Sequence, residues 1–516
     1  MSYDEGRGPP PGVPLAMIER RAFLASAAAL SFAATARGVG AQGDDGEFSR
    51  SVVLDRARKL AAEPFKAPPA LPAALTALSA GDYASIRFRD GRRFFIDPPT
   101  GFAVDLVHPG FIYTVPVEIY LIAAGQAQAV AYDPELYTFG NVAPPAPDAL
   151  PGGFAGFRVL SALNQPDVLV PFASFAGASY FQAISKDQVF GTSARGLAIG
   201  TGEAQGEEFP FFRAHWIEPP AGDRIVVHSL LDGQSATGAY RFTLRPGDVT
   251  QIDVEATIFA RDEITHLGLA PLTSMFLFDA KDRGEHDDYR LAVHDADGLA
   301  MWNGSDERLW RPLHAPRLLQ ISAFSDTSPR GFGLIQREKR FEAYEDLTSM
   351  FHRKPSVWIE PIGAWGKGHI VLVEIPSNDE VHDNIVAYWR PASPVPAGSE
   401  VSLTYRLTWG WDVPDLGGLL RVVRTLSGSG PDGRRRFIVD FAGDASSPIR
   451  ASAVQVSAQA NPGSLVNAVI TENPEVGGLR LQFDLDADGA EQVEMRVDLR
   501  SGDRPISETW VYRWSS

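Results

Sequence analysis

Short runs of alternating apolar and polar residues, broken by glycine, proline and aspartate, fill most of the chain from residue 86 onward. Examples are "SIRFRDGRRFFI", "RIVVHSLLDGQSATGAYRFTLRPG" and "VTQIDVEATIFAR". Alternation with a period of two places every second side chain on the same face of a strand, and the breaks supply turns. The pattern therefore predicts a mainly-β protein of many antiparallel strands.

Apolar residues recur at helical spacing in a few segments. The stretch "SVVLDRARKLAAEPF", residues 51–65, predicts an amphipathic helix stopped by Pro64, and residues 68–86 predict a second, short helix. A further helix is predicted over 341–351, because apolar side chains recur there every three or four residues. These side chains are Phe341, Tyr344, Leu347 and Phe351.

The composition changes at "RPASPVPAGSE", where three prolines stand among small residues. We expect a linker at residues 391–400. Residues 45–390 would then form a large antiparallel β-sandwich domain. Residues 401–516 again carry short strand-like runs, and their number fits a single small β-sandwich of the immunoglobulin-like kind.

Residues 1–41 are typical of a twin-arginine signal peptide. Arg20 and Arg21 precede an Ala-rich apolar run that ends in small residues at Ala41. Such signals export folded proteins, so we expect the mature protein in the periplasm. The apolar run is shorter than the roughly 20 residues of a membrane span, so we expect no membrane insertion of the mature chain.

The formal net charge of −17 argues against nucleic acid and anionic membranes as partners, because both repel an acidic surface. The chain has no cysteine, which excludes disulfides and thiolate metal sites. The stretch "DLDADG" at 484–489 starts like a calcium-binding loop, but Met495 stands where that loop needs a bidentate glutamate. We therefore predict an Asp-Gly hairpin turn there, and no metal or cofactor.

Carboxylates and tryptophans gather in three turn-rich stretches. They are "YRLAVHDADGLAMWNG", "PSVWIEPIGAWGKGHIVLVEIP" and "SNDEVHDNIVAYWRP". Pyranose rings stack on aromatic faces, while carboxylates and guanidinium groups bind sugar hydroxyls. The stretches therefore favour a glycan-binding cleft. Taken singly, each tryptophan is more often a core residue and each Asp-rich turn more often a solvated turn, and only their combination favours the cleft.

Longer stretches resemble a known family. "GTSARGLAIGTGEAQGEEFPFFRAHWIEPP", "SPRGFGLIQR" and "RKPSVWIEPIGAWGKGHIVLVEIPSNDEVHDNIVAYWRP" are similar to the periplasmic glucan biosynthesis proteins, the MdoG/OpgG and OpgD family, from about residue 48 onward. The twin-arginine signal resembles the OpgD branch. The resemblance implies a mutarotase-like β-sandwich with a cleft, followed by an immunoglobulin-like domain. It also implies a role in making osmoregulated periplasmic glucans, as an inverting glycoside hydrolase or a transglycosylase acting on β-1,2-linked glucan.

By this resemblance the general acid maps onto Asp383 and the distant general base onto Asp295, which would act through a relay of water and a sugar hydroxyl. Asp297 is the alternative base. The chemistry of the residues supports a carboxylate pair but does not choose it. The residues expected to bind the substrate are Trp358, Trp365, Glu380, Asp379, Arg311, Trp302, His294 and Asp297.

Two other functions remain open at this point. The protein could bind glucan without catalysis, as a scaffold that presents nascent chains to a membrane glucosyltransferase. A mutarotase or a lyase on a related sandwich is the third and weaker alternative.

Overall fold

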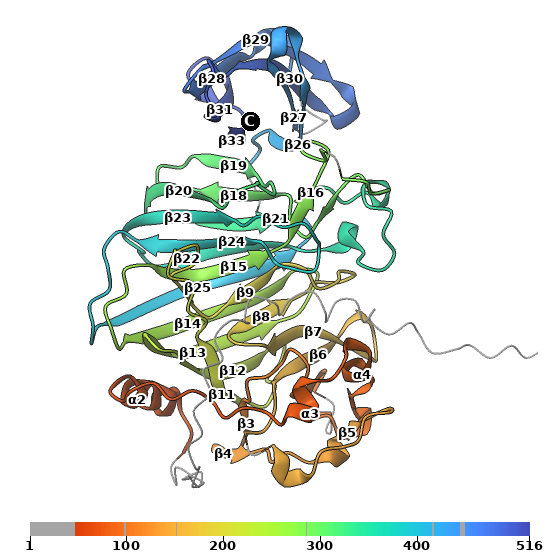
Figure 1. Ribbon diagram of the computed structural model, residues 1–516, viewed down its shortest axis with the longest axis vertical. Helices are drawn as coiled ribbons and strands as arrows, with labels where there is room; N and C mark the ends of the chain where they lie inside the picture. Colours follow the sequence, from red (N-terminus) through yellow and green to blue (C-terminus); the bar gives the residue numbers. More distant parts are fainter. Residues whose placement is uncertain (1–46, 97–99, 151, 285, 415–416, 444–448) are drawn as a thin grey trace, which may run out of the picture.

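The computed structural model describes residues 47–516 except 97–99, 151, 285, 415–416 and 444–448. Strands dominate the described residues, which confirms the mainly-β prediction (Figure 1). The export signal expected at residues 1–41 lies outside the described residues.

Two large sheets form the body of the molecule. The first is ten-stranded, in the order β2-β6-β7-β8-β9-β15-β24-β23-β20, with β10 paired to β15. Its strands are β2 (Phe102–Val107), β6 (Gly156–Gln165), β7 (Val168–Ala176), β8 (Tyr180–Ala183), β9 (Ser193–Arg195), β10 (Ala198–Ile199), β15 (Leu267–Ser274), β20 (Gln320–Thr327), β23 (Lys367–Glu374) and β24 (Ile385–Pro391).

The second sheet is fifteen-stranded, in the order β28-β31-β33-β19-β18-β21-β22-β25-β14-β13-β12-β11-β3-β4, with β32 paired to β31. Its strands are β3 (Glu118–Ala123), β4 (Gln126–Ala129), β11 (Phe211–Ile217), β12 (Ile225–Asp232), β13 (Ala236–Arg245), β14 (Thr250–Ala260), β18 (Gly298–Trp302), β19 (Arg308–Pro312), β21 (Gly331–Ile335), β22 (Ser356–Ile362), β25 (Glu400–Gly410), β28 (Gln455–Asn461), β31 (Gln492–Ser501), β32 (Arg504–Pro505) and β33 (Thr509–Ser515).

Three smaller sheets complete the fold. One is four-stranded, in the order β26 (Arg421–Ser429), β27 (Arg435–Ala442), β30 (Gly478–Asp486) and β29 (Ser464–Asn473). The other two are two-stranded: β1 (Arg87–Phe88) pairs with β5 (Tyr137–Thr138), and β16 (Phe276–Phe278) pairs with β17 (Val293–His294). Most strand pairs are antiparallel, but β3 pairs with β11 and β19 with β33 in parallel.

The main core lies between the two large sheets. Phe175 of β7 and Phe242 of β13 meet there with ring centroids 5.1 Å apart. Burying apolar surface between sheets that carry every second side chain inward is the main source of stability for such a sandwich.

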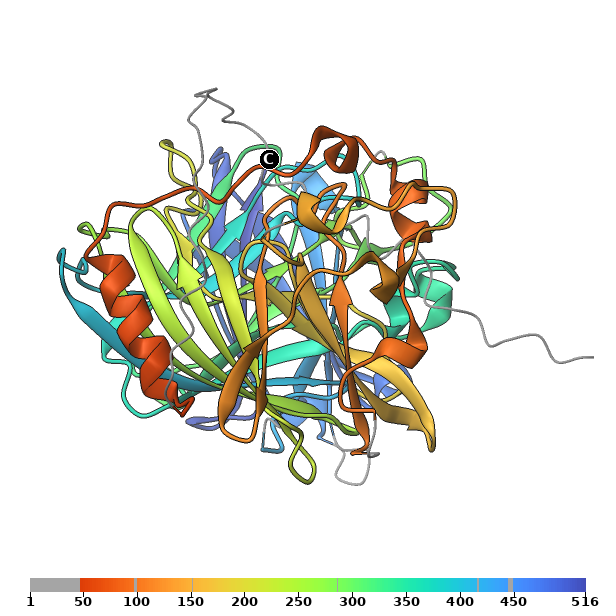
Figure 2. The ribbon, with the colours of Figure 1, turned by 90° about the horizontal axis from the view of Figure 1, so that it is seen from below.

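The predicted N-terminal helix is confirmed as α2 (Arg50–Ala61). It lies across the outer face of β12, β13 and β14, where Val53 and Ala57 are buried against Trp216 (Figure 2). This cover explains why every residue of β12 is buried. The second predicted helix is divided into α3 (Ala73–Thr76) and α4 (Ala80–Ser85), because Ser79 accepts the backbone N–H of Asp82 and starts a new helix.

The prediction of a helix over residues 341–351 is wrong. The structure has two 3-10 turns, η4 (Phe341–Ala343) and η5 (Phe351–Arg353), with Glu345 and Met350 between them at positive φ. The carboxylate of Asp346 accepts the backbone N–H groups of residues 348 and 349 at 2.8 and 2.7 Å. An aspartate side chain competes in this way with the backbone hydrogen bonds of a helix. The spacing of apolar residues gives no information about this competition.

The expected linker at 391–400 crosses from one large sheet to the other. β24 precedes it in the first sheet, and β25 follows it in the second, between β22 and β14. Halfway across, Val395 exchanges two backbone hydrogen bonds with Ile264. The division of the chain at this point stays a prediction, and the pairing of β25 favours a boundary after Gly410.

The C-terminal strands form a unit at one end of the body (Figure 1). β28, β31 and β33 extend the fifteen-stranded sheet beyond β19, and the four-stranded sheet packs over them. The shared core contains Trp310 and Trp358 from the body with Phe437 and Trp510 from the C-terminal unit. The unit and the body are therefore joined by both a strand pair and a common core.

The turn at 484–489 joins β30 to β31, which belong to different sheets. The prediction of a hairpin turn there is therefore wrong. Asp484 forms an ion pair with Arg436, and Asp486 forms one with Arg434. These neighbouring arginines neutralise the carboxylates that resembled a calcium loop.

Candidate functional site

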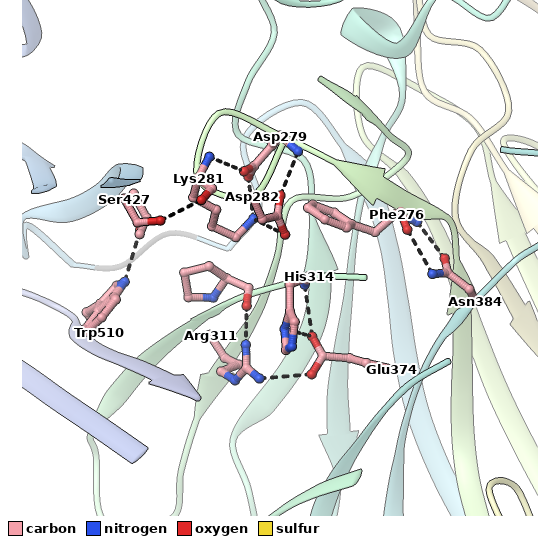
Figure 3. A network of polar contacts seen from close by, with 12 residues as sticks. Phe276, Asp279, Lys281, Asp282, Arg311, His314, Glu374, Asn384, Ser427 and Trp510 are labelled. Atoms are coloured by element: carbon pink, nitrogen blue, oxygen red, sulfur yellow. Dashed lines mark hydrogen bonds and ion pairs between the residues drawn. The ribbon is translucent and has the colours of Figure 1, made fainter. Parts of the chain in front are cut away.

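Asp383 closes the loop that connects β23 to β24, which we call the acid loop (residues 375–383). Only 8% of Asp383 is exposed. The next residue, Asn384, anchors the end of the loop: its amide nitrogen donates to the carbonyl of Phe276, and its amide oxygen accepts the N–H of Phe276 (Figure 3). The amide nitrogen also donates to the carbonyl of Ile375. Three hydrogen bonds from one buried amide fix the backbone next to Asp383.

Asp295 follows β17 and is 5% exposed. Its backbone N–H donates to the carbonyl of Met275 at 2.8 Å, while the N–H of Asn384 donates to the carbonyl of Ser274 at 3.1 Å. The segments that carry Asp295 and Asp383 are thus attached to adjacent residues at the end of β15. The structure brings these two candidate acids to the same short stretch of backbone.

Lys354 is the charged neighbour of Asp295. Its ammonium nitrogen lies 3.5 Å from Oδ1 of Asp295 and donates to the carbonyl of Phe190 at 2.5 Å. Lys354 is 2% exposed. An ammonium group buried beside a carboxylate favours the ionised form of that carboxylate, which is the form that a general base requires.

Arg195 of β9 is the charged neighbour of Asp383. Burial alone would lower the pKa of Arg195, but Tyr180, Glu207 and Asp383 outweigh burial and raise it. Arg195 donates to Glu207 at 2.6 Å and to Thr273 at 2.8 Å. Glu207 balances the charge of the Arg195 guanidinium. Asp383 therefore lies near a neutral ion pair and not near an isolated cation.

Tyr180 lies under the same guanidinium, with the Arg195 carbon 5.2 Å from the ring centroid. Burial raises the pKa of Tyr180 to about 12; Arg195 opposes the rise, and Asp383 adds to it. The hydroxyl therefore stays protonated at neutral pH, so the surroundings of Asp383 combine a hydrogen-bond donor with a balanced ion pair.

His294 and Asp297, on either side of Asp295, hold the backbone. The ring of His294 stacks on Phe276 and hydrogen-bonds Gln336 at 2.9 Å, and burial lowers its pKa. Oδ2 of Asp297 accepts the backbone N–H groups of Arg337 and Glu338 at 3.0 Å each. Burial raises the pKa of Asp297, against the opposing effect of His294 and Arg337. These contacts favour structural roles for both residues.

Arg311 belongs to a buried ion network. It donates to Glu374 at 2.9 Å, and His314 contacts the other oxygen of Glu374 through its backbone N–H and Nδ1 (Figure 3). Burial alone would raise the pKa of Glu374, but Arg311 and His314 lower it to about 2. Arg311 is 1% exposed, a position that favours support of β23 over direct contact with a sugar.

The three predicted tryptophans are spread over the molecule. Trp358 is 3% exposed and packs in the core shared with the C-terminal unit, a position that favours packing over sugar stacking. Trp365 is half-buried, with its ring centroid 6.0 Å from that of Tyr405. Trp302 lies at the end of β18, with the guanidinium carbons of Arg308 and Arg330 4.1 and 5.3 Å from its ring centroid.

A depression of about 650 Å³ lies near Trp302, at the opposite end of β23 from the acid loop. At 3.3 Å per residue, the length of β23 places the two about 23 Å apart. The depression is lined by Gly304, Ser305, Ser325, Asp326, Thr327, Lys367, Gly368, His369 and Ala392.

Asp379 and Glu380 differ in their surroundings. Asp379 is exposed and shapes the acid loop locally by accepting the N–H of Val381 at 2.8 Å. Glu380 reaches outward from the loop to Arg290, with its Oε2 2.7 Å from Nη1.

Sequence reasoning missed Asn384, Lys354, Arg195 and Arg290. Each acts through partners far away in the chain: Asn384 and Phe276 are 108 positions apart, and Arg195 and Thr273 are 78 apart. Periodicity and local composition carry no information about such pairs. A lone arginine in the mostly small and apolar run "GTSARGLAIG" was the one local signal for a buried cation.

Within the described part of the chain, no group of three or more acidic or histidine side chains could hold a metal ion. Among the same residues, no helix has both the length and the apolar character needed to cross a membrane.

Comparison with solved structures gives only a distant likeness. A polysaccharide lyase matches 60% of this chain and 35% of its own at 12% identity, with a TM-score of 0.18. A likeness of this size supports no inference about fold or activity.

Comparison with known sequences is decisive. The family model "Periplasmic glucan biosynthesis protein, MdoG" matches residues 48–514. Glucans biosynthesis protein G of Rhodopseudomonas palustris is 47% identical over 91% of this chain and 94% of its own, and that of Bradyrhizobium diazoefficiens is 45% identical over 96% and 100%. Glucans biosynthesis protein G of Shewanella putrefaciens is 46% identical over 91% and 87%. The chain therefore belongs to the MdoG family and is a periplasmic protein of glucan biosynthesis.

Proposed function

We propose that the protein acts on β-1,2-linked glucan, as an inverting glycoside hydrolase or a transglycosylase, and so controls the structure of the glucan backbone. One observation carries the proposal: the segments of the nearly buried residues Asp383 and Asp295 are attached to adjacent residues at the end of β15. Glycoside hydrolysis needs two such carboxyl groups in different protonation states.

The two carboxyl groups take different roles. Asp383 donates its proton to the glycosidic oxygen while the bond from that oxygen to the anomeric carbon breaks. Asp295, whose carboxylate lies beside the ammonium group of Lys354, accepts the proton that the attacking water loses. Inverting enzymes usually hold their carboxyl groups roughly 6.5–9.5 Å apart, and a wider spacing calls for a relay through water and a sugar hydroxyl. In transfer, a hydroxyl of a second glucan chain replaces the water.

The finer family assignment is part of this proposal. The pair Arg20 and Arg21 supports the OpgD branch, and the family resemblance supports a mutarotase-like body with an immunoglobulin-like C-terminal domain. The relatives compared above all carry the name glucans biosynthesis protein G, so the assignment to the OpgD branch rests on the arginine pair alone.

The test is incubation of the purified mature protein with linear β-1,2-glucan. Chain length is followed by mass spectrometry and the configuration of new reducing ends by NMR. Shorter chains whose ends first appear in the α-configuration support inverting hydrolysis, and longer or cyclic chains support transfer. Glucan that keeps its length throughout would contradict the enzymatic proposal.

The depression at the far end of β23 favours an alternative function, non-catalytic binding of glucan. Its hydroxyl, carboxylate and imidazole groups suit sugar hydroxyls, but it has no pair of buried carboxyl groups. A non-catalytic protein could hold glucan there for a membrane glucosyltransferase. Calorimetric binding of glucan without turnover, equal in the wild type and in Asp383→Asn, would favour this scaffold. A product absorbing in the ultraviolet would indicate a lyase.

A further inference from the structure

One arginine joins the acid loop to two neighbouring loops. The guanidinium of Arg290 lies 2.7 Å from Oδ2 of Asp288, 3.0 Å from Oδ2 of Asp346 and 2.7 Å from Oε2 of Glu380. Its side chain is only 12% exposed. A planar guanidinium has five N–H donors in fixed directions, so it can bind several carboxylates at once in one geometry.

The three carboxylates come from three separate parts of the chain. Asp288 lies between β16 and β17, Asp346 between the turns η4 and η5, and Glu380 in the acid loop. Asp288 also accepts the backbone N–H of Arg290 at 2.9 Å. Asp346 uses its other oxygen for the N–H groups of residues 348 and 349. Two of the carboxylates are therefore oriented by their own loops before the arginine binds them.

The acid loop gains an external support from this cluster. Hydrogen bonds between Ser377, Asp379 and Val381 shape the turn at 377–381, and Asn384 fixes the end of the loop. Arg290 holds the middle, three residues before Asp383. Without the guanidinium, three carboxylates would face each other, and their repulsion would push the acid loop away from the other two loops.

We propose that Arg290 is a positioning residue that holds the acid loop, and with it the carboxyl group of Asp383, in place. The expected effect of Arg290 on turnover rests on the proposed function. Its expected effect on the position of the acid loop does not depend on that function. A displacement of about 1 Å is enough to lower the rate of a positioned acid strongly. Arg290 acts through Glu380 and need not touch the glucan.

The test compares Arg290→Met with Arg290→Lys and with the control Arg340→Met. Arg340 is an exposed arginine whose guanidinium pairs with Glu338. We expect Arg290→Met to lower kcat at least tenfold with KM nearly unchanged, and to speed hydrogen exchange at residues 377–383. A lysine keeps the positive charge but lacks the planar, five-donor guanidinium, so Arg290→Lys should restore part of the activity. Arg340→Met should match the wild type in both measurements.

A second variant approaches the same contact from the loop. Glu380→Gln removes the charge that Arg290 binds, and its side chain is exposed enough for folding to tolerate the change. If both residues act through their contact, the double variant should lose no more activity than Arg290→Met alone. Additive losses, wild-type kcat in Arg290→Met, or unchanged exchange at 377–383 would each overturn the inference. A wild type without turnover would contradict the proposed function, and hydrogen exchange would then decide the role of Arg290 by itself.

Discussion

Lys354 and Asp295 form a buried ion pair, with 3.5 Å between the ammonium nitrogen and the nearer carboxylate oxygen. Lys354 precedes β22 and Asp295 follows β17, so two loops must fold together to make the pair. The same ammonium group donates to the carbonyl of Phe190, next to β9. The pair therefore links the charge of the proposed base to the geometry of the site.

Replacement of Lys354 by methionine tests this link. The carboxylate of Asp295 loses the charge that favours its ionised form, so it should bind a proton at a higher pH. We expect the acid limb of the pH profile of kcat to move upward by about one pH unit or more. Lys66→Met, which removes an exposed lysine far from both proposed glucan sites, is the control and should keep the wild-type profile. An unmoved acid limb in Lys354→Met would exclude Asp295 as the titrating base.

Asp383→Asn should remove the proton donor while leaving a side chain of nearly the same shape. We expect kcat to fall by about 10²–10⁴-fold, the usual contribution of a general acid, with glucan binding kept. Asp379→Asn changes an exposed carboxylate in the same loop and should lower kcat less than threefold, by at most about 0.7 kcal/mol. Equal losses in the two variants would mean that the loop, and not Asp383, matters.

Glu374 gives the fold a dependence on acid pH. Its pKa of about 2 in the folded protein lies below its ordinary value of 4.5, so its stabilising effect is full above pH 4.5 and is lost as pH falls towards 2. We expect Glu374→Gln to cost about 3–5 kcal/mol at pH 6, because Arg311 loses its buried partner.

At pH 3 the difference in unfolding free energy between the wild type and Glu374→Gln should shrink by about 2 kcal/mol, because the wild type has by then lost part of the effect. Urea denaturation at both pH values measures it. Glu360→Gln, at an exposed position, should show no such change. A difference that is the same at pH 6 and pH 3 would refute the low pKa.

Two substitutions of Asp297 distinguish a structural role of this residue from a catalytic one. Its Oδ2 accepts two backbone N–H groups, and the amide oxygen of asparagine can accept the same two. We therefore expect Asp297→Asn to keep most of the activity and Asp297→Ala to cost about 2–3 kcal/mol of stability. Denaturation and kcat of both variants check this, and an inactive but stable Asp297→Asn would make Asp297 the base.

Patterns along the chain predicted the strands and the helix α2, because alternation and helical spacing are local properties. They failed at 341–351, where a single side chain, Asp346, turns the backbone out of the helix. Family resemblance pointed to Asp383 and Asp295, whereas their charged neighbours Arg195 and Lys354 emerged only in three dimensions. Residues whose roles depend on distant partners leave no periodic trace in a sequence.

The parallel pairing of β19 with β33 has a consequence for biosynthesis. Leu309 of β19 pairs with Thr509 of β33, which leaves the ribosome about 200 residues later. Until then the backbone groups along this edge of β19 have no partner strand. An open, apolar strand edge invites pairing with other chains, and contacts this distant in sequence form slowly. A route that exports the chain only after folding, as Arg20 and Arg21 predict, would close this edge before the protein reaches the periplasm.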